Sequence, residues 1–410
     1  MQRQTVRWSL CASFLALSLV ASVAAPLAAG EKAASTALLT AGPVGISAAS
    51  AIVVDDATGQ VLWSRNPDTK RFPASTTKIL TALLVRERTR PDEMIWAPND
   101  VESVTGASLH LRPSEVLTAQ NLLTGILSRS ANDACYTAAV HIAGSVPKFA
   151  DLMNARAREL GATHTHFTNP HGLHEASHYT SARDLAIFAR AAMKDAEIRD
   201  LVRERRHTIE RSENQEDTLI ISKNKYLDED PTADGIKTGY TVPAGKCYVG
   251  SATRDGYRII TVVLKSENWE ADHRAMLKWA FGRYHGTDLA QTGVPLGHVP
   301  VDQGQANEVA LGVAQTIHGA WLRDAAPPEW RLRRPLTLSA PIRAGQVVGD
   351  WVAFCEGKPL LTVPAVALSE VSARSWIGPQ RSDGGWNAWI AAGILAAGSS
   401  VLVRRRPRRR

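Results

Sequence analysis

Residues 73–84 have the sequence Pro-Ala-Ser-Thr-Thr-Lys-Ile-Leu-Thr-Ala-Leu-Leu. Apolar residues recur over 79–84 with the spacing of one helix face, and proline is favoured just before a first helical turn. The stretch therefore predicts a helix that begins at Ser75. On such a helix Lys78 lies three residues further along, so its amine and the serine hydroxyl can meet on one face.

Two further short patterns follow along the chain, Ser130-Ala131-Asn132 and Lys237-Thr238-Gly239. Each pattern alone is weak, because an ordinary capped helix or a turn contains the same residue types. In this order, the three patterns indicate a serine acyl-transfer site in which lysine replaces histidine as the base.

The first two patterns predict the proton chemistry of this site. Lys78 must be neutral to accept the proton of Ser75, and burial together with a second cation, Lys237, should lower its pKa. We expect Ser130 to relay a proton to the leaving amine and Asn132 to hold the substrate amide.

The third pattern predicts how a substrate is held. Lys237 and Thr238 offer a charge and a hydroxyl to a carboxylate, and Gly239 lets the substrate backbone approach closely. The main-chain N–H groups of Ser75 and Tyr240 are the expected oxyanion hole.

The surrounding periodicity predicts an α/β domain over residues 45–285, with helices on a mostly antiparallel sheet and a helical subdomain. The expected elements are strands at 51–54 and 60–63, helices between 113 and 161 and over 182–193, strands at 235–239, 247–252 and 257–264, and a closing helix over 271–284.

Residues 286–379 lack long helical periodicity and predict a small all-β domain. Short β-like runs occur there at 308–311, 336–338, 346–349 and 360–363, separated by proline and glycine.

The N-terminus has the layout of a secretory signal peptide. Arg3 and Arg7 precede an apolar run over 10–23, and small residues follow over 24–29. We expect residues 1–29 to be removed on export; a membrane-spanning anchor is the alternative, which the shortness of the run disfavours.

Near the C-terminus, residues 386–403 carry no charge and follow a predicted linker over 380–385. As a helix this segment would reach about 27 Å, just enough for a bilayer core. The arginine-rich tail over 404–410 then belongs in the cytoplasm, with the body anchored at the outer face of the cytoplasmic membrane. A helix lying in the interface is the alternative.

The formal net charge is +7, but most of it comes from the ends of the chain, where Arg3, Arg7 and the six arginines of 404–410 lie. The body between them is nearly neutral, which argues against nucleic-acid binding through a basic surface. Export would leave Cys135, Cys247 and Cys355, an odd number that predicts no disulfide framework.

Five local contexts carry a resemblance to a known family, namely Phe-Pro-Ala-Ser-Thr-Thr-Lys at 72–78, Ser-Ala-Asn-Asp-Ala at 130–134, Thr-His-Phe-Thr-Asn-Pro-His-Gly-Leu at 165–173, Ser-Ala-Arg-Asp at 181–184 and Asp-Gly-Ile-Lys-Thr-Gly at 234–239. Residues 51–286 resemble the low-molecular-mass penicillin-binding proteins, which are serine-type D-alanyl-D-alanine carboxypeptidases. That family also carries a β-rich domain and a C-terminal anchor.

The resemblance implies a penicillin-binding/β-lactamase-like transpeptidase fold. It also implies that Ser75 is the acylated nucleophile, Lys78 its base, Ser130 and Asn132 the second element, and Lys237 the third. The implied substrate is the D-Ala-D-Ala end of peptidoglycan stem peptides, and β-lactams would acylate the same serine. The sequence departs from the family where Ala131 replaces a frequent glycine and where Tyr240 stands in place of histidine or leucine.

Three alternatives stay open at this point. Histidines crowd one stretch at His164, His166, His171, His174 and His178. They lack partners at ligand spacing, so we expect neither a metal nor another cofactor. A β-lactamase shares the three patterns, but no Glu-x-x-Leu-Asn sequence lies between the second and third. A non-catalytic wall-binding scaffold is disfavoured because the catalytic side chains are intact.

Overall fold

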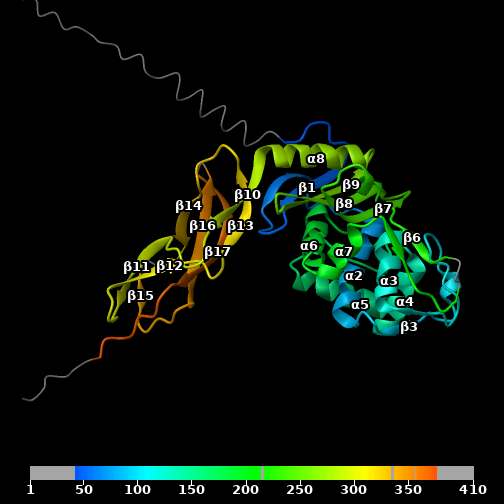
Figure 1. Cartoon of the computed structure of the whole chain (residues 1–410), viewed down its shortest axis with the longest axis horizontal. Helices are drawn as coiled ribbons and strands as arrows, with labels where there is room; N and C mark the ends of the chain where they lie inside the picture. Colours follow the sequence, from blue (N-terminus) through cyan, green and yellow to red (C-terminus); the bar gives the residue numbers. More distant parts are fainter. Residues whose placement is uncertain (1–41, 214–216, 334–336, 356, 376–410) are drawn as a thin grey trace, which may run out of the picture.

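The computed structural model describes residues 42–213, 217–333, 337–355 and 357–375 (Figure 1). They form an α/β lobe and an all-β lobe that extends away from it. The predicted signal peptide, linker, membrane segment and basic tail all lie outside the described residues. Within those residues, none of the helices has both the length and the apolar character needed to cross a bilayer.

The α/β lobe is organised around a five-stranded antiparallel sheet in the order β2-β1-β9-β8-β7. Its strands are β1 (Ser50–Asp55), β2 (Val61–Arg65), β7 (Ala233–Thr241), β8 (Gly245–Arg254) and β9 (Tyr257–Ser266). Both predicted hairpins are confirmed, and β7, which carries the third pattern, is an edge strand of this sheet.

Both faces of the sheet are buried, which follows from the apolar run in β1. Ile52 and Val54 belong to the large cluster on the helical face, whereas Ala51 and Val53 belong to the cluster on the other face. Successive strand residues point to opposite faces, so a continuous apolar strand requires cover on both. In Figure 1, α8 (Trp269–Arg283) lies on one side and the remaining helices on the other.

The helical subdomain follows the expected order of starts and stops. Its helices are α2 (Lys78–Arg88), α3 (Ala119–Thr124), the π-helical turn η3 (Gly125–Arg129), α4 (Asn132–Ala143), α5 (Val146–Glu159), α6 (Ala182–Ala192) and α7 (Ala196–Val202). Ser181 caps α6, because its side chain accepts a hydrogen bond from the N–H of Asp184.

Short elements that the sequence did not predict complete this lobe. They are the ribbon of β3 (Met94–Trp96) and β4 (Val116–Thr118), the ribbon of β5 (Arg206–Thr208) and β6 (Leu219–Ile221), and the 3₁₀ turns η2 (Val101–Ser103) and η4 (Lys225–Asp228). Strands of three residues give too little alternation for a sequence pattern to reveal them.

The second lobe is all-β, as expected. Its strands are β10 (Tyr284–Ala290), β11 (Gly297–Asp302), β12 (Glu308–Gly312), β13 (Ile317–Leu322), β14 (Glu329–Arg333), β15 (Leu338–Ser339), β16 (Val347–Cys355) and β17 (Lys358–Ala367). Six of them form a sheet in the order β14-β16-β17-β12-β11-β15, and β10 pairs with β13. Leu311, Trp351 and Ala365 lie in its core.

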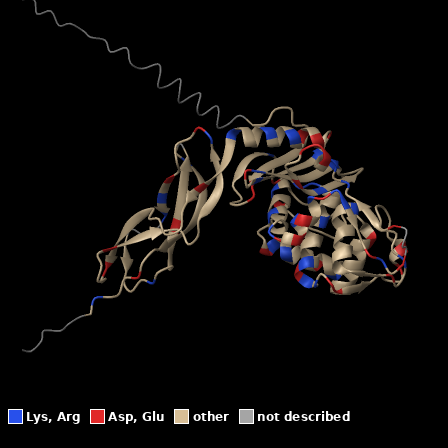
Figure 2. Cartoon of the chain, viewed as in Figure 1, with Lys and Arg blue, Asp and Glu red and all other residues tan. Residues whose placement is uncertain are grey.

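The two lobes meet where β13 approaches the end of β1. The main-chain N–H of Ala320 donates to Oδ2 of Asp55 over 3.3 Å, and Ala320 itself packs in the cluster beneath α8. Arg323 adds a hydrogen bond from Nε to the carbonyl of Phe281 at 3.2 Å. Figure 2 shows acidic and basic residues interspersed along the α/β lobe in this view, without division into faces of one sign.

Candidate active site

Ser75 lies in a tight turn immediately before α2. Residues Ala74–Thr77 form the 3₁₀ turn η1, and the α-helix begins at Lys78. The expected α-helical start at Ser75 is therefore tightened to 3₁₀, which is common in a first helical turn. Ala74 has a φ of +50°, a strained conformation for a residue with a side chain.

The side chain of Lys78 is fully buried. Its Nζ atom lies 3.0 Å from Oγ of Ser75 and 2.7 Å from Oδ1 of Asn132. A third contact, also 2.7 Å, joins it to the carbonyl oxygen of His171. When the amine is neutral, its two hydrogens can serve the amide and the carbonyl, and its lone pair then faces the serine hydroxyl.

The second pattern sits between two helices. Ser130 ends the turn η3 with a φ of +67°, and Asn132 is the first residue of α4. This left-handed residue turns the chain sharply, so that Ser130 and Asn132 both face the cleft described below. The Nζ atom of Lys237 donates to Oγ of Ser130 over 2.9 Å, which joins the third pattern to the second.

Gly239 lets β7 pass directly beside the turn that carries the serine. A Cβ atom placed on it would lie 3.0 Å from the main-chain nitrogen of Ser75 and 3.1 Å from the carbonyl oxygen of Pro73. Any side chain would therefore push the strand away from the serine, which is the physical reason for glycine here.

Both buried lysines have lowered pKa values. Burial is the main cause for Lys78, whose pKa falls to about 8, and the charge of Lys223 lowers it further, while Cys135 and Asp133 oppose the shift. Burial also holds the pKa of Lys237 well below its usual value, with repulsion from Lys78 as the next cause. Repulsion between two ammonium groups is mutual, so the neighbouring charges of Lys78 and Lys237 disfavour protonation of both amines at once.

A cleft of about 910 Å³ opens over these groups. Six of the predicted residues line it, namely Ser75, Ser130, Asn132, Thr238, Gly239 and Tyr240. Lys78 and Lys237 lie buried beneath them. The structure thus brings all eight predicted site residues to one place, with the Tyr240 side chain 64% exposed at the rim.

Sequence reasoning missed the basic side of this cleft. Arg129, Arg205, Lys223 and Lys225 also line it. The alternation of Lys223 and Lys225 is a weak signal that could have drawn attention to this segment, but short charged alternations are usually solvated surface. The carbonyl of His171 could not be found from sequence, because main-chain contacts leave no residue-type signal.

The histidine-rich stretch makes contacts of its own. His178 joins Thr77, which lies 2.9 Å from its Nε2 atom, to Thr168, whose main-chain N–H donates to its Nδ1 atom. Burial lowers the pKa of His178 to about 3, and that of His171 likewise to about 3. These histidines brace the loop behind the serine turn in their neutral form. Cys135 is a buried core residue beside the charge of Lys78.

Known proteins match this sequence and this fold. Residues 36–268 match the family model described as D-alanyl-D-alanine carboxypeptidase, and residues 284–373 match that of the penicillin-binding protein 5 C-terminal domain. The chain is 30% identical over 350 residues to D-alanyl-D-alanine carboxypeptidase DacF from Bacillus subtilis, covering 83% of this chain and 90% of that protein. It is also 30% identical over 356 residues to DacA from Escherichia coli K12, covering 81% and 86%.

The structure of penicillin-binding protein 5 from Haemophilus influenzae superposes with a TM-score of 0.72 at 27% identity, covering 81% of this chain and 99% of that one. Fold and site together define a serine peptidase of the penicillin-binding class. Within that class, the chain belongs to the D-alanyl-D-alanine carboxypeptidase family. It is a serine-type D-alanyl-D-alanine carboxypeptidase with a penicillin-binding fold.

Proposed function

We propose that this enzyme removes the terminal D-alanine of peptidoglycan stem pentapeptides through an acyl-enzyme on Ser75. The observation that carries the assignment is the fully buried amine of Lys78 at 3.0 Å from Oγ of Ser75. A serine hydroxyl needs an adjacent base, and a buried amine with a lowered pKa can serve as one near neutral pH.

In the acylation step, Oγ of Ser75 attacks the carbonyl carbon of the penultimate D-alanine and its proton passes to Nζ of Lys78. The oxyanion forms between the main-chain N–H groups of Ser75 and Tyr240. These groups come from the serine turn and from the strand β7 that passes beside it. Ser130, hydrogen-bonded to Lys237, passes a proton to the departing D-alanine amine as the C–N bond breaks, and the proton taken up by Lys78 replaces it on Oγ of Ser130. Water then hydrolyses the ester.

The remaining groups hold the substrate in this proposal. Asn132, fixed by Lys78, faces the substrate amide, while Lys237 and Thr238 face its terminal carboxylate. The basic rim of Arg205, Lys223 and Lys225 extends this attraction to further carboxylates of the stem peptide. A β-lactam would enter as an analogue of the D-Ala-D-Ala end and acylate Ser75.

The test combines a fluorescent penicillin with a synthetic pentapeptide that ends in D-Ala-D-Ala. We expect covalent labelling and release of free D-alanine by the wild type, and loss of both in Ser75→Ala. Ser177→Ala, an exposed serine outside the cleft, is the matched control and should behave as wild type.

Other outcomes identify the alternatives. Rapid penicillin turnover without D-alanine release would indicate a β-lactamase. Absence of both labelling and release in the folded wild type would indicate a non-catalytic scaffold, and retained labelling in Ser75→Ala would refute the assignment of the nucleophile.

We also propose export by the N-terminal segment and anchoring by residues 386–403 at the outer face of the cytoplasmic membrane. The uncharged apolar segment followed by arginines supports this placement. After expression in a bacterial host, the full chain should sediment with membranes, and a chain ending at residue 385 should be soluble. A chain lacking only 404–410 is the control and should still sediment, whereas sedimentation of the chain ending at 385 would contradict the proposal.

A further inference from the structure

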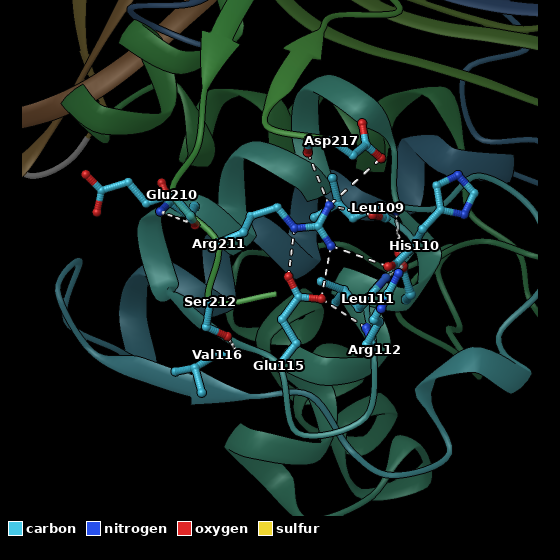
Figure 3. A network of polar contacts seen from close by, with 12 residues as sticks. Leu109, His110, Leu111, Arg112, Glu115, Val116, Glu210, Arg211, Ser212 and Asp217 are labelled. Atoms are coloured by element: carbon cyan, nitrogen blue, oxygen red, sulfur yellow. Dashed lines mark hydrogen bonds and ion pairs between the residues drawn. The ribbon is translucent and has the colours of Figure 1, made fainter. Parts of the chain in front are cut away.

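A buried ion pair lies outside the catalytic groups. The side chains of Arg211 and Glu115 are both fully inaccessible to solvent. Two hydrogen bonds join them, from Nε to Oε1 at 2.7 Å and from Nη2 to Oε2 at 3.0 Å (Figure 3). A buried pair of this kind is costly to desolvate, so a contribution to stability does not by itself explain its presence.

Arg211 also holds main-chain carbonyls of the loop that precedes Glu115. Its Nη1 atom donates to the carbonyl of Leu109 at 2.9 Å, and its Nη2 atom donates to that of His110 at 3.3 Å (Figure 3). The planar guanidinium group can serve a carboxylate and several carbonyls at once, which lysine cannot do. Residues 105–115, here called the front loop, are therefore fastened to Arg211.

The front loop is fastened at its other end to Asn132. The side-chain Nδ2 of Asn132 donates to the carbonyl of Thr105 at 2.8 Å, and its main-chain N–H donates to that of Ala107 at 2.6 Å. Gly106 has a φ of +96°, and a Cβ atom on it would lie 2.6 Å from the same Nδ2. Because Nδ2 is committed to Thr105, Oδ1 is the atom left to face Lys78.

Asp133 completes the fastening from the helix side. Its carboxylate accepts hydrogen bonds from the main-chain N–H groups of Leu109 and Leu111 and from the hydroxyl of Ser108. The front loop is thus held between the start of α4 and Arg211, with Gly106 and Ala107 forming part of the cleft wall.

Arg211 belongs to the segment that joins β5 to β6, and this ribbon forms another wall of the cleft. Ile221 and Ser222, at the end of β6, line the cleft, and so does Lys223, whose main-chain N–H donates to the carbonyl of Ser128 at 3.0 Å. The ion pair consequently joins two cleft walls that are about 100 residues apart in sequence.

We propose that Arg211 and Glu115 are positioning residues that fix the front loop against the β5–β6 ribbon and, through the carbonyl of Thr105, orient the amide of Asn132 toward Lys78. Without the pair, the front loop can shift, Asn132 can rotate, and the lysine loses a 2.7 Å acceptor. This inference depends on the roles proposed above for Lys78 and Asn132.

Loss of that acceptor has a consequence for proton transfer that simple destabilisation lacks. An oxygen that accepts from the ammonium form stabilises the charge, so its withdrawal lowers the pKa of Lys78 further. The charged and titratable groups that act on or sense this amine are Asp133 and Cys135 on α4, Lys223 after β6, Lys237 on β7, and His171 and His178 in the loop behind it. None of them is altered by the substitutions below.

The experiment measures the second-order rate of acylation by a fluorescent penicillin from pH 5 to 10, together with the melting temperature. Arg211→Met combined with Glu115→Leu removes both charges and leaves neither unpaired. We expect acylation to fall by about 10- to 100-fold, as for other displacements of groups near the reacting atoms, and its acidic limb to move to lower pH. Arg211→Lys should give an intermediate rate with the same direction of pH shift.

Arg86→Met is the matched control. Arg86 pairs with two carboxylates, those of Asp195 and Glu197, and none of these three residues lines the cleft. Its rate and pH profile should match those of the wild type.

Unchanged acylation in a folded double variant would overturn the inference. A smaller fraction of enzyme labelled by the penicillin, combined with a wild-type pH profile, would also overturn it, because that result indicates a purely structural pair. If the double variant does not fold, Arg211→Lys decides on the same two readouts. Labelling of Ser75→Ala is measured separately. If that variant is still labelled, the proposed nucleophile is refuted and not the role of the ion pair.

Discussion

The Nζ atom of Lys237 donates a hydrogen bond over 2.9 Å to Oγ of Ser130, a residue 107 positions earlier in the chain. This contact joins the edge strand β7 to the end of a helical turn. It also places a fully buried amine with a lowered pKa next to the hydroxyl proposed as the proton relay.

Lys237→Met should lower the activity of the enzyme while raising its stability. Acylation should fall by about 100-fold or more, because a transition-state contact is lost. The melting temperature should rise, because burial disfavours the charged lysine in the folded state. That penalty is complete below the folded-state pKa and disappears as the pH approaches 10.5, so the gain should be largest at low pH. Ser130→Ala is the control and should lower acylation without this pH-dependent gain; a melting temperature lowered equally at all pH values in Lys237→Met would contradict the prediction.

The rate of penicillin acylation by the wild type should increase with pH and level off above about 8, where Lys78 becomes neutral. His171 and His178 do not titrate in this range, since their pKa values are about 3. Stopped-flow fluorescence at constant ionic strength measures the profile. A rate that stays flat from pH 6 to 9 would show that the neutral amine does not limit acylation.

Gly239→Ala should reduce acylation by about 10- to 100-fold, because the added Cβ atom would lie 3.0 Å from the nitrogen of Ser75 and displace the strand from the serine turn. Gly282→Ala, in α8 with no atom within 4 Å of its added Cβ, is the steric control. It should leave acylation unchanged and stabilise the protein by about 0.5–1 kcal/mol. Equal acylation rates in the two variants would refute the steric explanation.

Lys225→Ala should weaken capture of peptides that carry several carboxylates. We expect kcat/KM to fall by about threefold at low salt, with a smaller effect at high salt, since an exposed charge is screened. An analogue with amidated carboxylates should be insensitive to the change. Lys194→Ala, an exposed lysine outside the cleft, controls for net charge; the same loss in both variants would assign the effect to long-range charge and not to the rim.

The sequence was sufficient to predict the local framework of the site. The apolar spacing after Ser75 predicted α2, and the turn before Tyr257 predicted the hairpin of β8 and β9. These features depend on neighbouring residues, so periodicity and turn chemistry reveal them. The tightening of the serine turn to 3₁₀ was not predictable, because a turn of four residues is too short to show a periodicity of its own.

Contacts between distant segments account for most of what was missed. Nothing near Glu115 in sequence indicates that Arg211 will bury against it, and the carbonyl of His171 reaches Lys78 only after the chain has folded back over 93 positions. The β5–β6 ribbon, with three residues in each strand, was too short to show alternation. The residues that flank it, Arg205, Lys223 and Lys225, nevertheless line the basic side of the cleft.

Strand β7 borders both the cleft and the serine turn. Within the described sheet it has a neighbouring strand on one side only, so its other edge pairs with no strand of that sheet. An open strand edge is normally a hazard, because foreign chains can pair with it. Under the proposed function, the same open edge would let an extended peptide lie alongside the strand and be recognised through its main chain. An enzyme built in this way can tolerate variation in the side chains of its polymer while it still selects the shape of its end.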